Sequence, residues 1–199
     1  MKRYFKNKKL LERNNVYSKD MEHDACGVGL VASTEGKKSR EVVEYGIQAL
    51  KAVWHRGAVD ADGKTGDGAG IHVEIPKEFF KEKIEVTGHV YDNSEICIGM
   101  IFLPRNNYEA QESCRTLVEK ELTQNDFNIY GWRQVPVNTK VLGEKAEQSR
   151  PEITQVLFRH NNQKLSGKSL EIKLYETRRK IENNVRQNHL DNFYICSFS

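Results

Sequence analysis

A single cysteine stands at the head of a short run of glycine and aliphatic residues, in residues 24–32 (DACGVGLVA). Cys26 follows a polar, basic leader, and removal of that leader would give it a free α-amine. The α-amine titrates near ~8 in peptides, so one residue would supply both the thiol nucleophile and its base. The alternative is a small residue packed in the core, because cysteine is among the most buried residue types. These residues alone favour packing.

A second group of chemically capable residues lies where an amphipathic segment meets a glycine-rich loop, in residues 54–71 (WHRGAVDADGKTGDGAGI). The guanidinium of Arg56 has the two-pronged donor face that suits a substrate carboxylate. His55 could act as a base, although a histidine near the end of a helix more often makes a capping contact. The segment therefore offers one anion-binding residue and one weaker candidate base.

The acidic side chains of this loop, Asp60, Asp62 and Asp67, invite a calcium interpretation. Their spacing does not fit an EF-hand loop, and no glutamate falls at the closing position. The glycines form neither a GxGxxG nor a P-loop pattern, which argues against a nucleotide cradle. Taken alone, the loop reads as a structural one that needs unusual backbone angles and close backbone approach.

Composition limits the class of protein. The chain has 199 residues, 38% hydrophobic and 30% charged, which suits one domain with a core of its own. The net charge of +3 is concentrated in the leader, and no basic stripe interleaved with aromatics predicts nucleic-acid binding. No apolar run is long enough for a membrane span, and the leader lacks the apolar core of a secretory signal. Four scattered cysteines without a CxxC pair argue against zinc and favour a reducing cytosol.

The elements that must position these residues mix helices and strands without a βαβ rhythm, which predicts an α+β fold with mostly antiparallel strands. Residues 1–21 read as a loose polar segment. Helices are expected at residues 40–56, 77–84, 106–124 and, after an ambiguous start, 169–187. Strands are expected at residues 26–33, 71–76, 95–104, 126–137, 152–160 and 191–199. The chain stops inside an apolar strand pattern, so we expect it to be truncated.

Several stretches occur together in an order that resembles one family. They are ACGVGLVA, ALKAVWHRGAVDADGKTGDGAGI, IYGWRQVPV, VLGEKA and FYICSFS. The chain is similar, over residues 20–199, to the N-terminal glutaminase domain of the large subunit of bacterial glutamate synthase, a class II glutamine amidotransferase. The resemblance implies an N-terminal-nucleophile hydrolase, a four-layer αββα sandwich of antiparallel sheets that is incomplete at the C-terminus here. Residues 1–25 would be a propeptide, and residues 26–199 the first part of the amidotransferase domain.

The resemblance also implies the chemistry. Cys26 would attack the side-chain amide carbon of glutamine, with its own α-amine as proton shuttle, and the glutamyl thioester would be hydrolysed after ammonia leaves. Arg56 matches the family arginine that binds the α-carboxylate of glutamine. The loop residues that would shape the site are Thr65, Gly66, Asp67 and Gly68. No metal ion is expected there. The family's asparagine–glycine pair, which supplies the oxyanion hole, lies beyond the end of this chain, and such a donor is worth ~10²–10³ in rate.

The resemblance implies no cofactor in this chain. In the full-length enzyme, ammonia would pass to a synthase domain and react with 2-oxoglutarate, with electrons supplied through FMN and an iron–sulphur cluster from NADPH or ferredoxin. The implied partners are glutamine, the missing synthase domains and a small electron-transferring subunit, in the cytoplasm.

Two other interpretations stay open at this point. The first is a non-catalytic remnant or binding module in which the leader stays on and Cys26 is a packed core thiol. The second is another class II amidotransferase, one that makes a nucleotide precursor or an amino sugar. Those enzymes begin at cysteine after a methionine or a short leader, so the long leader and the GWRQVPV and VLGEKA stretches speak against the second.

Overall fold

The structure is a computed structural model that describes residues 3, 6–7, 9–10, 27–53, 59–66 and 68–199. It divides into two units, Met1–Gly57 and Ala58–Ser199. In the first unit, helix α2 (Arg40–Ala52) confirms the predicted helix as far as Ala52, and the hydroxyl of Ser39 caps its start by accepting the N–H of Glu41. The last residues of that prediction, 54–56, lie outside the described residues.

The predicted strands at residues 26–33 and 71–76 are wrong where the structure describes them, since residues 27–33 and 71–76 form no strand. In the first segment the side chains of Val28 and Leu30 are each 91% exposed. An aliphatic run becomes a strand only when a neighbouring strand satisfies its backbone groups. The described residues contain no pairing partner for either segment.

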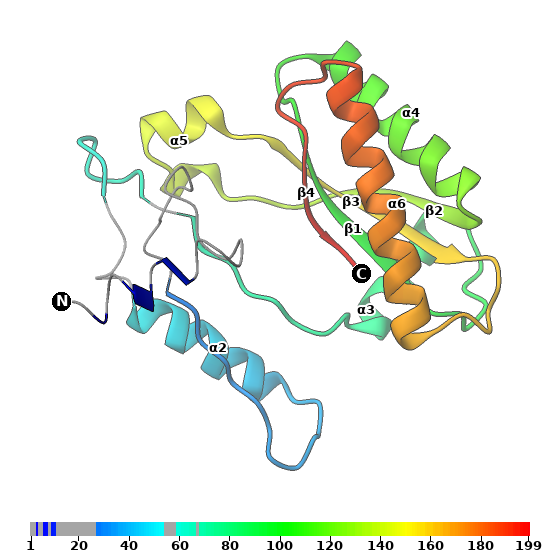
Figure 1. Ribbon diagram of the computed structural model, residues 1–199, viewed down its shortest axis with the longest axis horizontal. Helices are drawn as coiled ribbons and strands as arrows, with labels where there is room; N and C mark the ends of the chain where they lie inside the picture. The colour runs from blue at the N-terminus through cyan, green and yellow to red at the C-terminus, as the bar shows by residue number, and fades with distance from the viewer. Residues whose placement is uncertain (1–2, 4–5, 8, 11–26, 54–58, 67) are drawn as a thin grey trace. The chain divides into compact units, whose positions relative to one another are not determined.

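The second unit is built on one antiparallel sheet of four strands in the order β2–β3–β1–β4 (Figure 1). Their register pairs Cys97 with Phe158 and Gly99 with Phe198, so the two central strands come first and third along the chain. The strands are β1 (Cys97–Leu103), β2 (Phe127–Gln134), β3 (Glu152–His160) and β4 (Tyr194–Phe198). All four strands were predicted from the sequence, and the structure confirms them.

Two long helices lie side by side over one face of this sheet (Figure 1). They are α4 (Tyr108–Gln124) and α6 (Gly167–Gln187), both predicted from the sequence and confirmed. The side chain of Asn107 starts α4 by accepting the N–H of Ala110 at 3.0 Å. The largest side chains of the core between helices and sheet, all at most 2% exposed, are Ile101, Leu103, Leu122, Phe127, Phe158, Leu174, Ile181 and Ile195.

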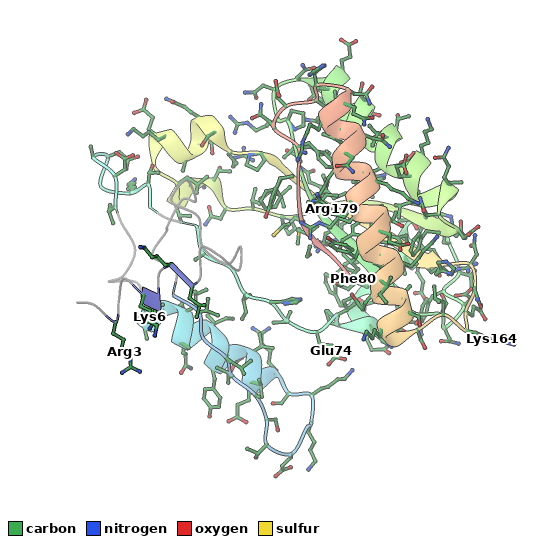
Figure 2. The ribbon with its side chains drawn as sticks, viewed as in Figure 1. Arg3, Lys6, Glu74, Phe80, Lys164 and Arg179 are labelled. Carbon is green, nitrogen blue, oxygen red and sulfur yellow. The ribbon has the colours of Figure 1, made fainter. Side chains whose placement is uncertain are left out.

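The opposite face of the sheet carries a smaller core against helix α3 (Lys77–Val86), whose side chain Phe80 is labelled in Figure 2. Phe80 packs there with Ile98, Tyr130 and Leu157. Because neighbouring residues of a strand face opposite sides, Ile98 belongs to this core while Cys97 belongs to the other. Burial on both faces thus explains the continuous apolar run of β1 and the consecutive apolar residues 156–158 of β3.

Helix α3 leaves part of that second face without a covering element among the described residues. Met100, Phe102 and Ile153 are only half-buried there, and Tyr194 on β4 is 57% exposed. The rings of Phe102 and Tyr194 are 5.9 Å apart. The α+β class with antiparallel strands is therefore confirmed for the described residues. A four-layer sandwich needs two sheets and is not confirmed, because the described residues form one antiparallel sheet.

Two short elements between β2 and β3 were not predicted from the sequence. They are the 3₁₀ turn η2 (Thr139–Val141) and the helix α5 (Glu144–Ser149). The VLGEKA stretch, residues 141–146, spans the end of the turn and the start of the helix.

Candidate functional site

The structure describes part of the site that the sequence predicts. Thr65, Gly66 and Gly68 of the glycine-rich loop are among the described residues. Outside them lie the expected nucleophile, the expected carboxylate clamp and two neighbours: Cys26, His55, Arg56 and Asp67. The roles of these four residues stay predictions, and the geometry below concerns the loop.

Residues 59–66 form a closed loop whose two ends meet. A β-bridge joins Val59 to Gly66, and the N–H of Asp60 donates to the carbonyl of Thr65 at 2.7 Å. At the tip, the N–H of Gly63 donates to the carbonyl of Asp60 at 2.9 Å. Gly63 has φ +68°, a conformation that glycine adopts without the clash of a side chain. The sequence-based expectation of unusual backbone angles in this loop is confirmed at this residue.

The carboxylate of Asp62 organises the loop from within. One of its oxygens accepts the N–H groups of Lys64, at 2.9 Å, and Thr65, at 2.7 Å, and the other accepts the hydroxyl of Thr65. The Thr65 hydroxyl, followed by the backbone N–H groups of Thr65, Lys64 and Lys145, holds the pKa of Asp62 well below its usual value. Hydrogen bonds to the charged form have this effect on any carboxyl group. Asp62 is therefore an ionised acceptor of hydrogen bonds near neutral pH.

The loop lies directly against the start of α5 (Figure 1). A Cβ added at Gly143 would stand 2.6 Å from the backbone nitrogen of Thr65 and would also collide with the Thr65 hydroxyl and the Asp62 carboxylate. Gly143 has φ −75°, so a glycine is required there for space and not for its backbone angle. The glycine of the VLGEKA stretch thus permits the loop and the helix to approach each other.

A side chain of α5 completes this contact. The ammonium of Lys145 lies 2.8 Å and 2.7 Å from the two carboxylate oxygens of Asp60. The hydroxyl of Thr65 also accepts the N–H of Ala146 at 3.4 Å. We call the set of residues that make these contacts the loop–α5 junction: Asp60, Asp62, Thr65, Gly143 and Lys145.

The junction accounts for the two acidic side chains of the loop that the structure describes. Asp60 is paired with a lysine, and Asp62 accepts hydrogen bonds from the chain itself. Within residues 27–53, 59–66 and 68–199, no group of three or more His, Cys, Asp or Glu side chains is placed to hold a metal ion. Both carboxylates have a structural role that needs no bound cation.

The described cysteines differ sharply in their suitability as nucleophiles. Burial raises the pKa of the Cys97 thiol to about 12 and that of the Cys114 thiol to about 11. Because the thiolate is the reactive form, both groups are inert at neutral pH. Cys196 on β4 is exposed. Cys97 and Cys114 therefore have packing roles in the core beneath α4 and α6.

Sequence reasoning missed the contribution of α5 to the site. Gly143 and Lys145 entered the sequence analysis only as members of the VLGEKA stretch, which resembles the family. Nothing in that stretch by itself indicates which other residues it contacts. The sequence offered two signals that could have revealed this contribution. They are the glycine before a short polar segment and a lysine whose charge is opposite to that of the acidic loop.

A second feature of this unit is an open, polar pocket of about 420 Å³ at the start of α4 and the turn between α6 and β4. Its lining includes Asn107, Glu109, Ser113, His189 and Asp191. Of the predicted site residues that the structure describes, Thr65, Gly66 and Gly68, none lines it. No helix among the described residues has the length and apolar character that crossing a membrane requires.

Comparison with known proteins gives a consistent result. The family model of class II glutamine amidotransferases matches residues 26–199. The chain is 54% identical over 185 residues to the glutamate synthase [NADPH] large chain of Azospirillum brasilense, covering 93% of this chain and 12% of that protein. It is 35% identical over 195 residues to the ferredoxin-dependent glutamate synthase of Pyropia yezoensis (96% and 12%). It is 35% identical over 188 residues to the glutamate synthase [NADPH] large chain of Bacillus subtilis (92% and 12%), so it spans about an eighth of the relatives' length.

Proposed function

Because the chain belongs to the class II glutamine amidotransferases, we propose that it carries part of the glutamine-hydrolysing site of a glutamate synthase large chain, including the nucleophile and the carboxylate clamp. The observation that carries the proposal is the family match, which spans residues 26–199 and so has Cys26 as its first residue. The relatives over nearly the whole chain are glutamate synthases, which supports this assignment over an amidotransferase for nucleotides or amino sugars.

In this proposal residues 1–25 are removed and Cys26 becomes the N-terminal residue. Its α-amine takes the thiol proton, and the sulfur attacks the side-chain amide carbon of glutamine. The carbon–nitrogen bond then breaks, the protonated leaving group departs as ammonia, and a glutamyl thioester remains. Water attacks the thioester carbon, the carbon–sulfur bond breaks, and glutamate leaves with the thiol restored.

Arg56 binds the α-carboxylate of glutamine through its bidentate donor face. Thr65, Gly66, Asp67 and Gly68 shape the wall of the site beside it. The closed geometry of residues 59–66 supports a shaping role, because a loop fixed by its own hydrogen bonds keeps its position when substrate binds.

We propose the four-layer αββα sandwich as the complete fold. The half-buried Met100, Phe102 and Ile153 on the sheet face that α3 leaves open support it. A second antiparallel sheet packed on that face would bury these side chains between two layers, and α4 with α6 would form one outer layer.

For the whole protein, we propose that other domains combine the released ammonia with 2-oxoglutarate. The reaction would take place in the cytoplasm, and a small electron-transferring subunit would be the partner. FMN, an iron–sulphur cluster and NADPH or ferredoxin would supply the electrons there. The described thiols do not fit a cluster, which takes a set of thiolate ligands converging on the iron. Cys97 and Cys114 are packed into the core and hold their protons, so we assign neither of them as a ligand of the cluster.

The test is a pair of cysteine variants in the protein as its source cells make it. Cys26→Ala should abolish ammonia release from glutamine and leave residues 1–25 attached in the intact mass. Cys196→Ala, which removes an exposed thiol on β4, should leave both properties unchanged. Undiminished ammonia release by Cys26→Ala would refute the proposal, and a wild-type protein that keeps Met1 and releases no ammonia would favour a non-catalytic module.

A further inference from the structure

We infer that the first turn of α5 is a positioning element for glutamine, acting through the loop–α5 junction on the chain segments at both ends of residues 59–66. This inference rests on the proposed function. Lys145 and Gly143 contact the loop, so in this inference their effect on glutamine is transmitted through Asp60, Asp62 and Thr65.

The first step of the argument is the closure of the loop. The bridge between Val59 and Gly66 brings the two ends of the loop together, so the loop and its ends move as one body. In the sequence Arg56 precedes Val59 by three residues, a reach of at most ~10 Å of extended chain. Gly68 follows Gly66 by two residues. The proposed clamp and the site-shaping residues are thus the nearest neighbours of the loop along the chain, and we expect a displacement of the loop to act on them.

The second step is that the junction joins segments remote in the sequence through specific contacts. The Asp62 carboxylate accepts hydrogen bonds from the N–H and hydroxyl of Thr65, and the Thr65 hydroxyl in turn accepts the backbone N–H of Ala146 on α5 at 3.4 Å. The side chain of Lys145 reaches back to Asp60. Gly143 provides the space in which these groups meet. The first turn of α5 thus contacts the loop through the Lys145 side chain and the backbone N–H of Ala146, and the lack of a side chain at Gly143 leaves room for these contacts.

The third step is that α5 is itself held to the sheet. Glu147 accepts hydrogen bonds from Arg105, which follows the end of β1, and from Arg150 at 3.0 Å. Both arginines hold the pKa of Glu147 below its usual value. The connection therefore runs from β1 through Arg105 and α5 to the loop, and a rigid sheet is a better reference for a binding residue than a free surface loop.

The parts of the junction should contribute unequally. The Lys145 side chain is 63% exposed and that of Asp60 is 35% exposed, and such surface ion pairs contribute little. Asp62 receives several hydrogen bonds on a charged group, and Gly143 faces backbone, so neither can be replaced without moving the loop. We therefore expect Gly143 and Asp62 to dominate the effect.

The experiment compares two reagents at the Cys26 thiol of the mature protein. The first is 6-diazo-5-oxo-L-norleucine, a glutamine-like electrophile with an α-carboxylate, and the second is iodoacetamide, which lacks one. Peptide mass mapping follows the labelling rate of Cys26 in the wild type, Gly143→Ala, Asp62→Ala and Asp62→Asn. Lys140→Ala is the matched control, because this exposed lysine of η2 enters no ion pair among the described residues.

A misplacement of about 1 Å at a positioning residue can cost ~100-fold, so we expect Gly143→Ala and Asp62→Ala to slow the glutamine-like reagent by ~10–100-fold. Iodoacetamide should react at the wild-type rate, and KM for glutamine should rise more than kcat falls. Asp62→Asn keeps one oxygen for the loop N–H groups and should recover part of the rate. The control should match the wild type with both reagents.

Each remaining outcome overturns the inference in a distinguishable way. Equal slowing of both reagents in Gly143→Ala and Asp62→Ala would mean a general loss of structure. Wild-type rates with both reagents would mean that the junction does not position the clamp, while the proposed function stands. A wild-type Cys26 that does not react with the glutamine-like reagent would refute the proposed function and this inference together.

Discussion

Replacing Gly99 by alanine tests the packing between the sheet and its helical layer. Gly99 lies in the middle of β1, and an added Cβ would stand 2.7 Å from a methyl carbon of Val156 and 2.9 Å from two ring carbons of Phe198. Both neighbours are buried, so neither can move into solvent. Overpacking of this kind costs ~1–3 kcal/mol, and alanine recovers ~0.5–1 kcal/mol through its lower backbone entropy loss in a strand. The free energy of unfolding should therefore fall by about 1–2 kcal/mol.

The assay is urea unfolding of the whole protein, followed by the fluorescence of Trp132, which packs against the core. A second variant, Val156→Ala, removes the methyl carbon closest to the added Cβ and costs ~2 kcal/mol alone. In the double variant the Cβ at position 99 occupies the vacated space, so its cost should be ~1 kcal/mol less than the sum of the single costs. Gly70→Ala is the control, because nothing lies within 4 Å of a Cβ added there, and it should change stability by less than ~0.5 kcal/mol.

Strict additivity in the double variant would refute the reasoning, because it would mean that the two positions do not share the same space. Wild-type stability of Gly99→Ala would refute it more deeply. The register that places Gly99 opposite both Val156 and Phe198 would then be wrong.

Three further predictions follow from the same unit. Alkylation of the folded protein at pH 8 should modify Cys196 and spare Cys97 and Cys114 until the protein unfolds, as intact mass after timed quenching would report. Asn107→Ala should lower the free energy of unfolding by ~1 kcal/mol in urea titration, because the cap of α4 is lost. Glu147 should titrate below the ordinary pKa of a glutamate in carboxyl NMR. Its hydrogen bonds to the two arginines then stabilise the fold fully at pH values above the ordinary pKa, and this stabilisation is lost as the pH falls through the lowered pKa.

The elements that sequence reasoning predicted well are those whose cause is local. Asn107 marks the start of α4, and the spacing of apolar residues marks its buried face. The uninterrupted apolar run of β1 and the three consecutive apolar residues 156–158 of β3 arise because both faces of these strands are buried there. Such signals survive in the sequence because one residue and its near neighbours carry them.

The errors arise where the cause lies far along the chain. Val28 and Leu30 belong to an aliphatic run that was predicted as a strand, but the run alone does not supply the partner that a strand needs. Helix α5 was missed because its residues, EKAEQS, carry no apolar periodicity. The requirement for glycine at position 143 depends on Asp62 and Thr65, which lie much earlier in the chain. The glycine-rich loop was recognisable as part of a site, and the helix that holds it was not.

The order of strands in the sheet has a consequence for synthesis of the chain. β1 is made first and stays central, yet Cys97 must wait for Phe158 and Gly99 for Phe198 before either edge of β1 is paired. At ~5–20 residues per second the ribosome needs about 5–20 s to pass from β1 to the end of β4. Until β3 has been made the apolar run CIGMIFL has no partner strand, and until β4 has been made one of its edges stays unpaired, so it is the kind of segment that associates with other chains. The nascent protein should therefore depend on chaperones until β4 has emerged.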